Sequence, residues 1–199
     1  MMKNTTTARE RLIQATFELL ERQGYHGTGL NQIIKESGAP KGSLYYYFPN
    51  GKEELVSRAI GEQGKALADR IRRALEGVQD PAEAVYSMML HLAEKLEQSK
   101  CTKAGSFAAV ALETSNTSEM LRETINKTYD AFISAIQGML LAHGFSEARA
   151  VQIATLITAS MEGAVVLCRT KKSTEPLRHI AQEMKHLLRS AIAENDAGS

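Results

Sequence analysis

Apolar residues recur at helical spacing along almost the whole chain, and no segment shows the period of two that a strand requires. The first such stripe has members three and four residues apart: Leu12, Ile13, Thr16, Phe17 and Leu20. Thr7 and Glu10 precede it at the spacing of a capping box. The pattern predicts a first helix that begins after Thr7, and an all-α fold.

A shorter apolar run follows, with residues behind it that stop one helix and start another. The run consists of Leu30, Ile33 and Ile34. Gly38 permits a tight turn after it, and Pro40 suits a first helical position. Residues 27–55 therefore predict two short helices joined by a turn, followed by a longer helix.

The second of these short helices carries five polar or aromatic side chains in its first turns: Lys41, Ser43, Tyr45, Tyr46 and Tyr47. Successive residues on a helix point roughly 100° apart, so at least one tyrosine must face outward. In helix-turn-helix proteins this part of the second helix enters the major groove of DNA. The pattern favours DNA recognition, and the alternative is an aromatic cluster in the core of an ordinary bundle.

The rest of the chain contains a series of helix start signals. A fourth helix is expected from Asn50, with Glu53 three residues on, to about Leu75, and Gly61 and Gly64 inside it suggest a pliable segment. Further starts are expected at Asp80 with Pro81, at Asn116 with Glu119, at Ser146 and at 173–176, and Gly144 should end the helix before Ser146. The chain should hold about nine helices.

The penultimate helix is apolar or small on every side and carries one charge, Glu162, between residues 151 and 168. Such a helix is buried all round, and one chain of this size has little to cover it with. A second copy of the protein is the expected cover, in contact with the small side chains of Ala150, Ala154, Thr158, Gly163 and Ala164. The alternative is a hairpin buried within a monomer.

Net charge, cysteine spacing and the lack of a recognised signal or membrane segment narrow the classes of function that the protein can have. The net charge of +1 over 199 residues argues against a general nucleic-acid coat, whereas a groove-binding protein needs only local positive charge. Cys101 and Cys168 lie far apart without metal-ligand spacing, so reduced, buried thiols are expected. No signal peptide and no long uncharged apolar run is recognised, so a cytoplasmic protein without a membrane partner is expected.

An enzyme is the rival class. His179, Glu183 and His186 share one face of the last helix, but no other ligand is apparent and no metalloprotease, nucleotide-binding or hydrolase motif occurs. We therefore expect no catalytic residue, no metal and no cofactor. A helical-bundle enzyme and a ligand-independent interaction module stay open as alternatives.

The motifs of residues 30–55 resemble the N-terminal domain of the TetR family of bacterial transcription regulators. The resemblance rests on the turn at Gly38, the segment Lys-Gly-Ser-Leu-Tyr-Tyr-Tyr-Phe at 41–48 and the segment Lys-Glu-Glu-Leu at 52–55. The segments at 40–44, 49–55, 74–76 and 173–177 also resemble the LmrA/YxaF-like subgroup. Tyr47 stands where the family often has histidine, so the DNA sequence cannot be transferred.

This resemblance implies a three-helix helix-turn-helix DNA-binding domain over residues 1–52 and a larger helical ligand-binding and dimerisation domain over 53–199. It implies three partners, which are double-stranded operator DNA, a small-molecule effector and a second copy of the chain. The expected DNA contacts are Arg9, Thr28 and Lys52 to phosphates, and Lys41, Gly42, Ser43, Tyr45, Tyr46 and Tyr47 in the groove.

Soft and aromatic side chains are abundant in the helices of the larger domain. Methionines adapt to varied ligand shapes, and a few polar groups can orient a ligand in an apolar cleft. We expect an apolar or aromatic effector that releases the protein, acting as a repressor, from DNA. The expected ligand contacts are Met88, Met89, Leu92, Phe107, Val110, Thr114, Tyr129, Phe132, Ile136, Met161 and Glu162.

Overall fold

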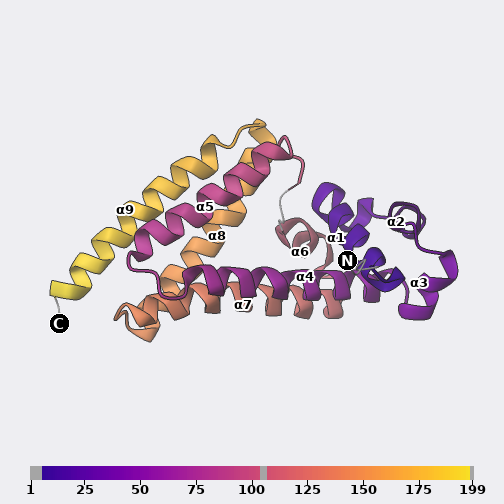
Figure 1. Cartoon of the computed structure of the whole chain (residues 1–199), viewed down its shortest axis with the longest axis horizontal. Helices are drawn as coiled ribbons and strands as arrows, with labels where there is room; N and C mark the ends of the chain where they lie inside the picture. The colour runs from indigo at the N-terminus through magenta and orange to yellow at the C-terminus, as the bar shows by residue number, and fades with distance from the viewer. Residues whose placement is uncertain (1–5, 104–106, 198–199) are drawn as a thin grey trace, which may run out of the picture. The chain divides into compact units, whose positions relative to one another are not determined.

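The computed structural model describes residues 6–103 and 107–197, and within them it contains nine helices and no strand (Figure 1). The all-α prediction is confirmed. The helices are α1 Ala8–Gly27, α2 Leu30–Ser37, α3 Lys41–Tyr47, α4 Lys52–Leu75, α5 Pro81–Gln98, α6 Phe107–Thr114, α7 Glu119–Ala142, α8 Glu147–Lys171 and α9 Glu175–Ala197.

Several of the predicted start signals operate as expected. The hydroxyl of Thr7 accepts the N–H of Glu10 at 3.2 Å, and the Glu10 carboxylate accepts the N–H of Thr7 at 2.8 Å, which completes the capping box. Asp80 accepts two N–H groups at the start of α5, and Ser146 accepts one at the start of α8. Local hydrogen bonding by short polar side chains therefore sets these helix ends.

Two predicted starts are wrong by one or more residues. The helix α4 begins at Lys52, and it is Glu54, not Glu53, that accepts the N–H of Asn50, at 3.1 Å. Gly51, with φ at +75°, extends the turn by a residue. The helix α7 is capped by Ser118, whose hydroxyl accepts the Leu121 N–H at 3.1 Å, because residues 114–118 form turns.

The chain forms two compact units, and each unit combines segments distant in sequence. The first consists of Met1–Gly64 and Phe107–Thr128, and the second of Lys65–Ser106 and Tyr129–Ser199. Both α4 and α7 therefore contribute to both units. The domain boundary that we expect between residues 52 and 53 stays a prediction.

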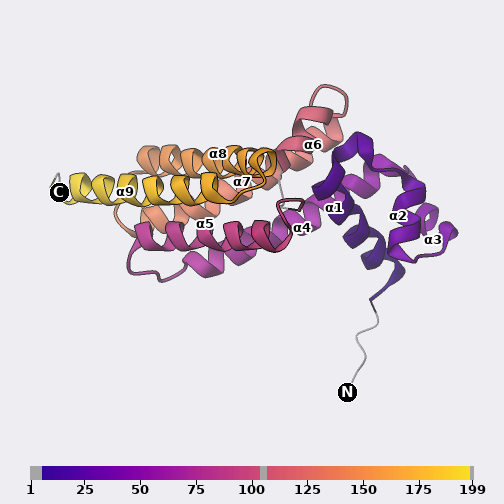
Figure 2. The ribbon, with the colours of Figure 1, turned by 90° about the horizontal axis from the view of Figure 1, so that it is seen from above.

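The first unit has a small core in which α1, α2, α3 and the start of α4 meet (Figure 2). Leu12, Ile33, Leu44, Phe48 and Leu55 are among its largest members, each at most 1% exposed. The left-handed backbone of Gly38, at φ +61°, ends α2 and turns the chain into α3. This packing fixes the orientation of α3.

The helix α6 belongs to the same unit and packs on α1. The Glu113 carboxylate accepts the N–H of His26 at 2.7 Å, and the rings of Phe17 and Phe107 lie 6.0 Å apart. Gly24, at φ +72°, interrupts the helical geometry of α1 beside Glu113, where a side chain would collide with that carboxylate. The carboxylate thus holds the end of α1 at a point where only glycine fits.

The second unit has a larger core, to which α5, α8 and α9 contribute side by side (Figures 1 and 2). Cys101 and Cys168 are buried in this core, as expected for structural thiols. Ion pairs of Lys185 with Glu83 and of Arg178 with Glu97 lie along the contact of α9 with α5. The core and these pairs hold the elements that form the site described below.

The glycines of α4 do not interrupt it, and the expected pliability of this segment stays a prediction. The helix runs unbroken through both glycines, and Gly64 is packed against α7. A Cβ atom at Gly64 would lie 2.5 Å from the Cγ2 atom of Thr128, whereas one at Gly61 would lie 3.7 Å from the Cγ2 atom of Thr124. The close approach of α7 therefore explains why residue 64 is glycine, but it does not explain the glycine at position 61.

This difference gives a matched pair of substitutions. We expect Gly64→Ala to destabilise the protein by about 1–2 kcal/mol, because buried Thr128 must move to admit the methyl group. We expect Gly61→Ala to stabilise it by up to about 1 kcal/mol, the usual gain of alanine over glycine in a helix. Urea unfolding of both variants measures the two effects, and equal stabilisation by both would contradict the close approach at Gly64.

Candidate nucleic-acid interface and internal pocket

The helix α3 presents its three consecutive tyrosines to solvent. Tyr46 is 80% exposed, Tyr45 51% and Tyr47 38%, so they do not form a core cluster. Leu44 and Phe48, four residues apart, are buried on the opposite side of the helix and anchor it. Lys41 and Gly42 are exposed at its start, and Ser43 is half-buried. We define Lys41, Gly42, Ser43, Tyr45, Tyr46 and Tyr47 as the recognition surface.

Two local features shape the recognition surface. The rings of Tyr46 and Tyr47 meet edge to face with centroids 4.9 Å apart, which restricts both side chains. A Cβ atom at Gly42 would meet nothing within 4 Å, so the fold of this chain does not itself demand glycine there. The backbone at Gly42 is therefore open, on the same helix as the three exposed tyrosines.

The three expected phosphate contacts are engaged within the chain. Thr28 is fully buried and its hydroxyl donates to the carbonyl of Gly24 at 2.7 Å, because the turn after α1 draws it inward. The structure therefore does not expose the Thr28 side chain, and a phosphate contact by Thr28 stays a prediction. Arg9 forms an ion pair with Glu62. Both partners of this pair are part-exposed, and such pairs are weak.

Lys52 is held by the backbone and ring of one residue. Its Nζ atom donates to the carbonyl of Tyr25 at 2.7 Å and lies 4.0 Å from the centroid of the Tyr25 ring. Partial burial lowers the pKa of Lys52, with a smaller opposing effect from the charge of Glu113. The ammonium group thus links the start of α4 to the end of α1, and a phosphate contact by Lys52 stays a prediction.

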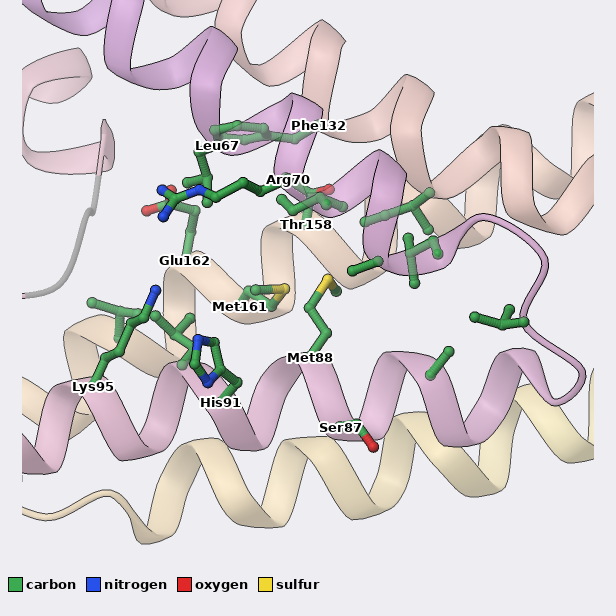
Figure 3. Close-up of a pocket in the computed structure, with 18 residues that line it drawn as sticks. Leu67, Arg70, Ser87, Met88, His91, Lys95, Phe132, Thr158, Met161 and Glu162 are labelled. Atoms are coloured by element: carbon green, nitrogen blue, oxygen red, sulfur yellow. The ribbon is translucent and has the colours of Figure 1, made fainter.

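The second unit contains a pocket of about 520 Å³ (Figure 3). Its walls come from α4, α5, α7 and α8, and most of them are apolar. The volume is in the range of small-molecule sites. It is lined by Leu67, Arg70, Ile71, Ala74, Leu75, Val78, Ala84, Ser87, Met88, His91, Leu92, Lys95, Phe132, Ile136, Thr158, Met161, Glu162 and Val165.

Six of the expected ligand contacts line this pocket, namely Met88, Leu92, Phe132, Ile136, Met161 and Glu162. The others do not. Met89 points into the core of the second unit. Phe107, Val110 and Thr114 are buried in the first unit, where Thr114 donates to the carbonyl of Val110 at 2.7 Å. None of these four residues lines the pocket in the structure.

Tyr129 lies next to the pocket and not in its wall. Burial, the charge of Glu162 and a hydrogen bond to Glu162 raise the pKa of Tyr129, so its hydroxyl stays protonated and donates to the carboxylate. The polar lining of Arg70, Ser87, His91 and Lys95 was not predicted, because charged residues on amphipathic helices normally face solvent. The contribution of α4 was also missed, since its stripe predicts only a connecting helix.

The helix α8 is covered on one side only. Ala150, Ala154 and Ala164 are fully buried in the chain's own core and Thr158 lines the pocket, so of the five expected contacts with a second copy only Gly163 is exposed. The exposed side of α8 also carries Gln152 and Thr155 but is mostly apolar, and we define its residues Val151, Leu156, Gly163, Val166 and Leu167 as the α8 face.

Among the described residues, α8 is long and apolar enough to cross a membrane by length and composition alone.

Among the described residues, no three His, Cys, Asp or Glu side chains gather into a possible metal site. This includes the face of α9 with His179, Glu183 and His186, where the Nε2 atom of His186 lies 2.8 Å from the amide nitrogen of Gln182. The structure thus offers two candidate sites, the recognition surface and the pocket.

Comparison with known proteins gives two family matches. Residues 12–59 match the model of the bacterial regulatory proteins of the tetR family, and residues 81–183 match the C-terminal domain of LmrA/YxaF-like transcriptional regulators. The HTH-type transcriptional regulator LmrA of Bacillus subtilis (strain 168) is 40% identical over 182 residues, which cover 92% of this chain and 97% of the relative. The uncharacterized regulator YxaF of the same organism is 38% identical over 94% of this chain and 98% of its own length.

Solved structures show the same fold. The crystal structure of reduced NemR from E. coli superimposes with a TM-score of 0.80 over 90% of this chain and 95% of its own, at 23% identity. The order of elements, with short N-terminal helices and a longer helical body, is therefore a shared architecture.

Proposed function

The chain belongs to the TetR family of bacterial transcriptional regulators, with an LmrA/YxaF-like C-terminal domain, and we propose that it is a homodimeric repressor released from its operator by a small, mainly apolar ligand. Its relatives are DNA-binding regulators and not enzymes. Repression and release by a ligand are the parts of this function that we propose.

The observation that carries the proposal is the exposure of the recognition surface on an otherwise well-packed helix. A tyrosine as exposed as Tyr46 leaves an apolar ring in water, which is unfavourable unless a partner covers it. Tyrosine offers a flat ring to thymine methyl groups and a hydroxyl to base edges or phosphates. The open backbone at Gly42 allows close approach of a groove wall. Together these features suit the major groove of DNA.

Positive charge around the recognition surface supports the same partner. Lys41 and Lys35 are exposed, and no ion pair to either is seen in residues 6–103 and 107–197. The exposed pair of Arg9 with Glu62 can exchange its carboxylate for a phosphate at little cost. We propose that these cations, with Lys52, position the protein on the DNA backbone, while the tyrosines distinguish sequences.

A second copy of the chain is the proposed cover for the α8 face. Two recognition helices must enter successive major grooves about 34 Å apart, so operator binding requires a dimer. The α8 face combines large apolar side chains with Gly163, which permits close helix approach. This cover also accounts for the apolar length of α8 without a membrane, and we place the protein in the cytoplasm.

Selection of bound sequences from a random duplex library tests the proposal. The full-length protein should enrich one near-palindromic site with half-sites about one helical turn apart. Its affinity for that site should exceed its affinity for random DNA by a factor of roughly 10³ or more. Absence of enrichment, with measurable binding to random DNA, would refute sequence-specific regulation by this protein.

The pocket is the proposed effector site, and Phe132 supplies a direct test of it. We expect Phe132→Ala to weaken effector binding at least tenfold while operator affinity without effector is unchanged, because binding of effector and of DNA are linked only through the protein. Leu140→Ala is the matched control, since Leu140 is also buried in the second unit but does not line the pocket. The measurement is release of labelled operator by effectors identified in a thermal-shift screen.

Both variants should lose stability of about 3–4 kcal/mol, so their effector response is compared at a temperature where each is folded. If Leu140→Ala lost effector response to the same degree, the effect would be one of stability and the pocket assignment would fail.

A further inference from the structure

The polar residues of the pocket are not spread evenly among its walls. Arg70 comes from α4, whereas His91 and Lys95 are four residues apart on α5 and so lie on one face of that helix. The opposite wall contributes Glu162 from α8, the one carboxylate in the described lining. Figure 3 shows the charged ends of Arg70 and Lys95 extending toward Glu162 from different helices, with His91 below them.

The rest of the lining is apolar. Met88, Met161 and Phe132 point into the same cavity, as Figure 3 shows, and none of them offers a strong hydrogen-bond donor. The pocket therefore has one charged end and one apolar body. A ligand that fills both must itself be amphiphilic.

The charges at this end do not balance. Arg70 and Lys95 contribute two positive charges against one negative charge from Glu162, and no ion pair of Arg70 or Lys95 is seen in the described part of the chain. Glu162 already accepts a hydrogen bond from Tyr129. His91 lies 3.7 Å from Glu94, but both side chains are more than half exposed, so this contact holds His91 weakly. An excess of donors thus faces a cavity that has few acceptors.

We infer that the effector carries one anionic group, a carboxylate or a group of similar charge, which Arg70 and Lys95 hold at the polar end while its apolar body occupies the cavity. The inference rests on the proposed function and adds the chemical class of the effector. A guanidinium group fits a carboxylate through two parallel hydrogen bonds, and the ammonium group of Lys95 adds a second charge. His91 is placed to donate a further hydrogen bond.

Three probes with the same apolar body separate the possibilities, namely decanoate, decanol and decylamine. Their binding to the full-length protein is measured by isothermal titration calorimetry below their aggregation limits. Decanoate should bind roughly tenfold more tightly than decanol, and decylamine should bind most weakly. The preference should fall at higher salt, because Arg70, His91 and Lys95 are exposed residues and their charges are screened by salt.

Arg70→Met and Lys95→Met keep the apolar stem of each side chain and remove its charge. Each should reduce decanoate affinity about fivefold and leave decanol affinity unchanged, whereas Glu162→Gln should increase decanoate affinity. Arg73→Met is the matched control, because Arg73 is an exposed arginine of the same helix that does not line the pocket. It should leave all three affinities as they are.

Three outcomes would overturn the inference. Equal affinity for decanoate and decanol would show that the charged end does not select an anion, although the pocket would remain an effector site. A preference for decylamine would assign recognition to Glu162 instead. Absence of binding by all three probes would remove both the inference and the pocket's proposed role, while the sequence-selection experiment would still test DNA binding by itself.

Discussion

Replacing Tyr46 by alanine is expected to abolish most of the protein's preference for its operator while its fold stays intact. The Tyr46 ring is 80% exposed, so its removal should change stability by no more than about 0.5 kcal/mol. A side chain that contacts base edges is worth about 1–3 kcal/mol of discrimination, which corresponds to a loss of roughly 5- to 150-fold on the operator. Affinity for random DNA, which depends on phosphate contacts, should change little.

Fluorescence anisotropy with operator and random duplexes measures both affinities. Tyr46→Phe separates the two parts of the side chain, because it keeps the ring and removes the hydroxyl. Leu112→Ala is the control for loss of an exposed apolar group elsewhere, since Leu112 on α6 is 86% exposed. If Tyr46→Ala weakened binding to operator and random DNA equally, Tyr46 would be a backbone contact and not a base contact.

Placing a charge on the α8 face is expected to produce the second large effect, conversion of the dimer to a monomer. Val166 is 52% exposed in the single chain, so Val166→Glu should leave the monomer folded. In a dimer the carboxylates of both copies would enter an apolar contact near the two-fold axis, at a penalty of several kcal/mol. Operator affinity should fall by at least roughly 100-fold, because one recognition helix reads only half a site.

Sedimentation velocity at micromolar concentration measures the change in mass, and the operator titration is repeated on the same samples. Leu112→Glu is the matched control, as it places the same charge on an exposed apolar residue outside α8. It should stay dimeric and bind the operator. A dimeric Val166→Glu protein would show that the α8 face is not the interface, whereas a monomeric wild-type protein would refute dimerisation itself.

Local hydrogen bonds and turns explain which helix ends could be predicted. The capping box at Thr7, the cap at Asp80 and the stop at Gly38 each depend on residues within four positions of one another. The cap of α7 could not be read in the same way, because Asn116 and Ser118 compete for it. Turns after α6 decide in favour of Ser118, which also donates to Glu53 of α4.

The candidate sites also differ in how far local sequence could predict them. Consecutive residues on a helix point in different directions, so the sequence predicted that at least one of the three tyrosines faces outward, and the structure exposes all three, Tyr47 least. Periodicity does not say which residues around an apolar helix face its own core and which face a partner. Four of the five residues expected at the dimer contact lie on the side of α8 that packs within the chain, and the dimer contact itself stays a prediction.

The all-α fold, several helix starts and an outward-facing tyrosine could be predicted from the chain alone, because these depend on hydrogen bonds and side-chain directions within a few residues. Three features appear only once the helices have packed, namely the inward turn of Thr28, the close approach of Thr128 to Gly64, and the lining of one pocket by Arg70, Lys95 and Glu162. Each of these features joins segments at least 25 residues apart in sequence or depends on a turn between helices. Their geometry is set by how the helices pack, which no local spacing records.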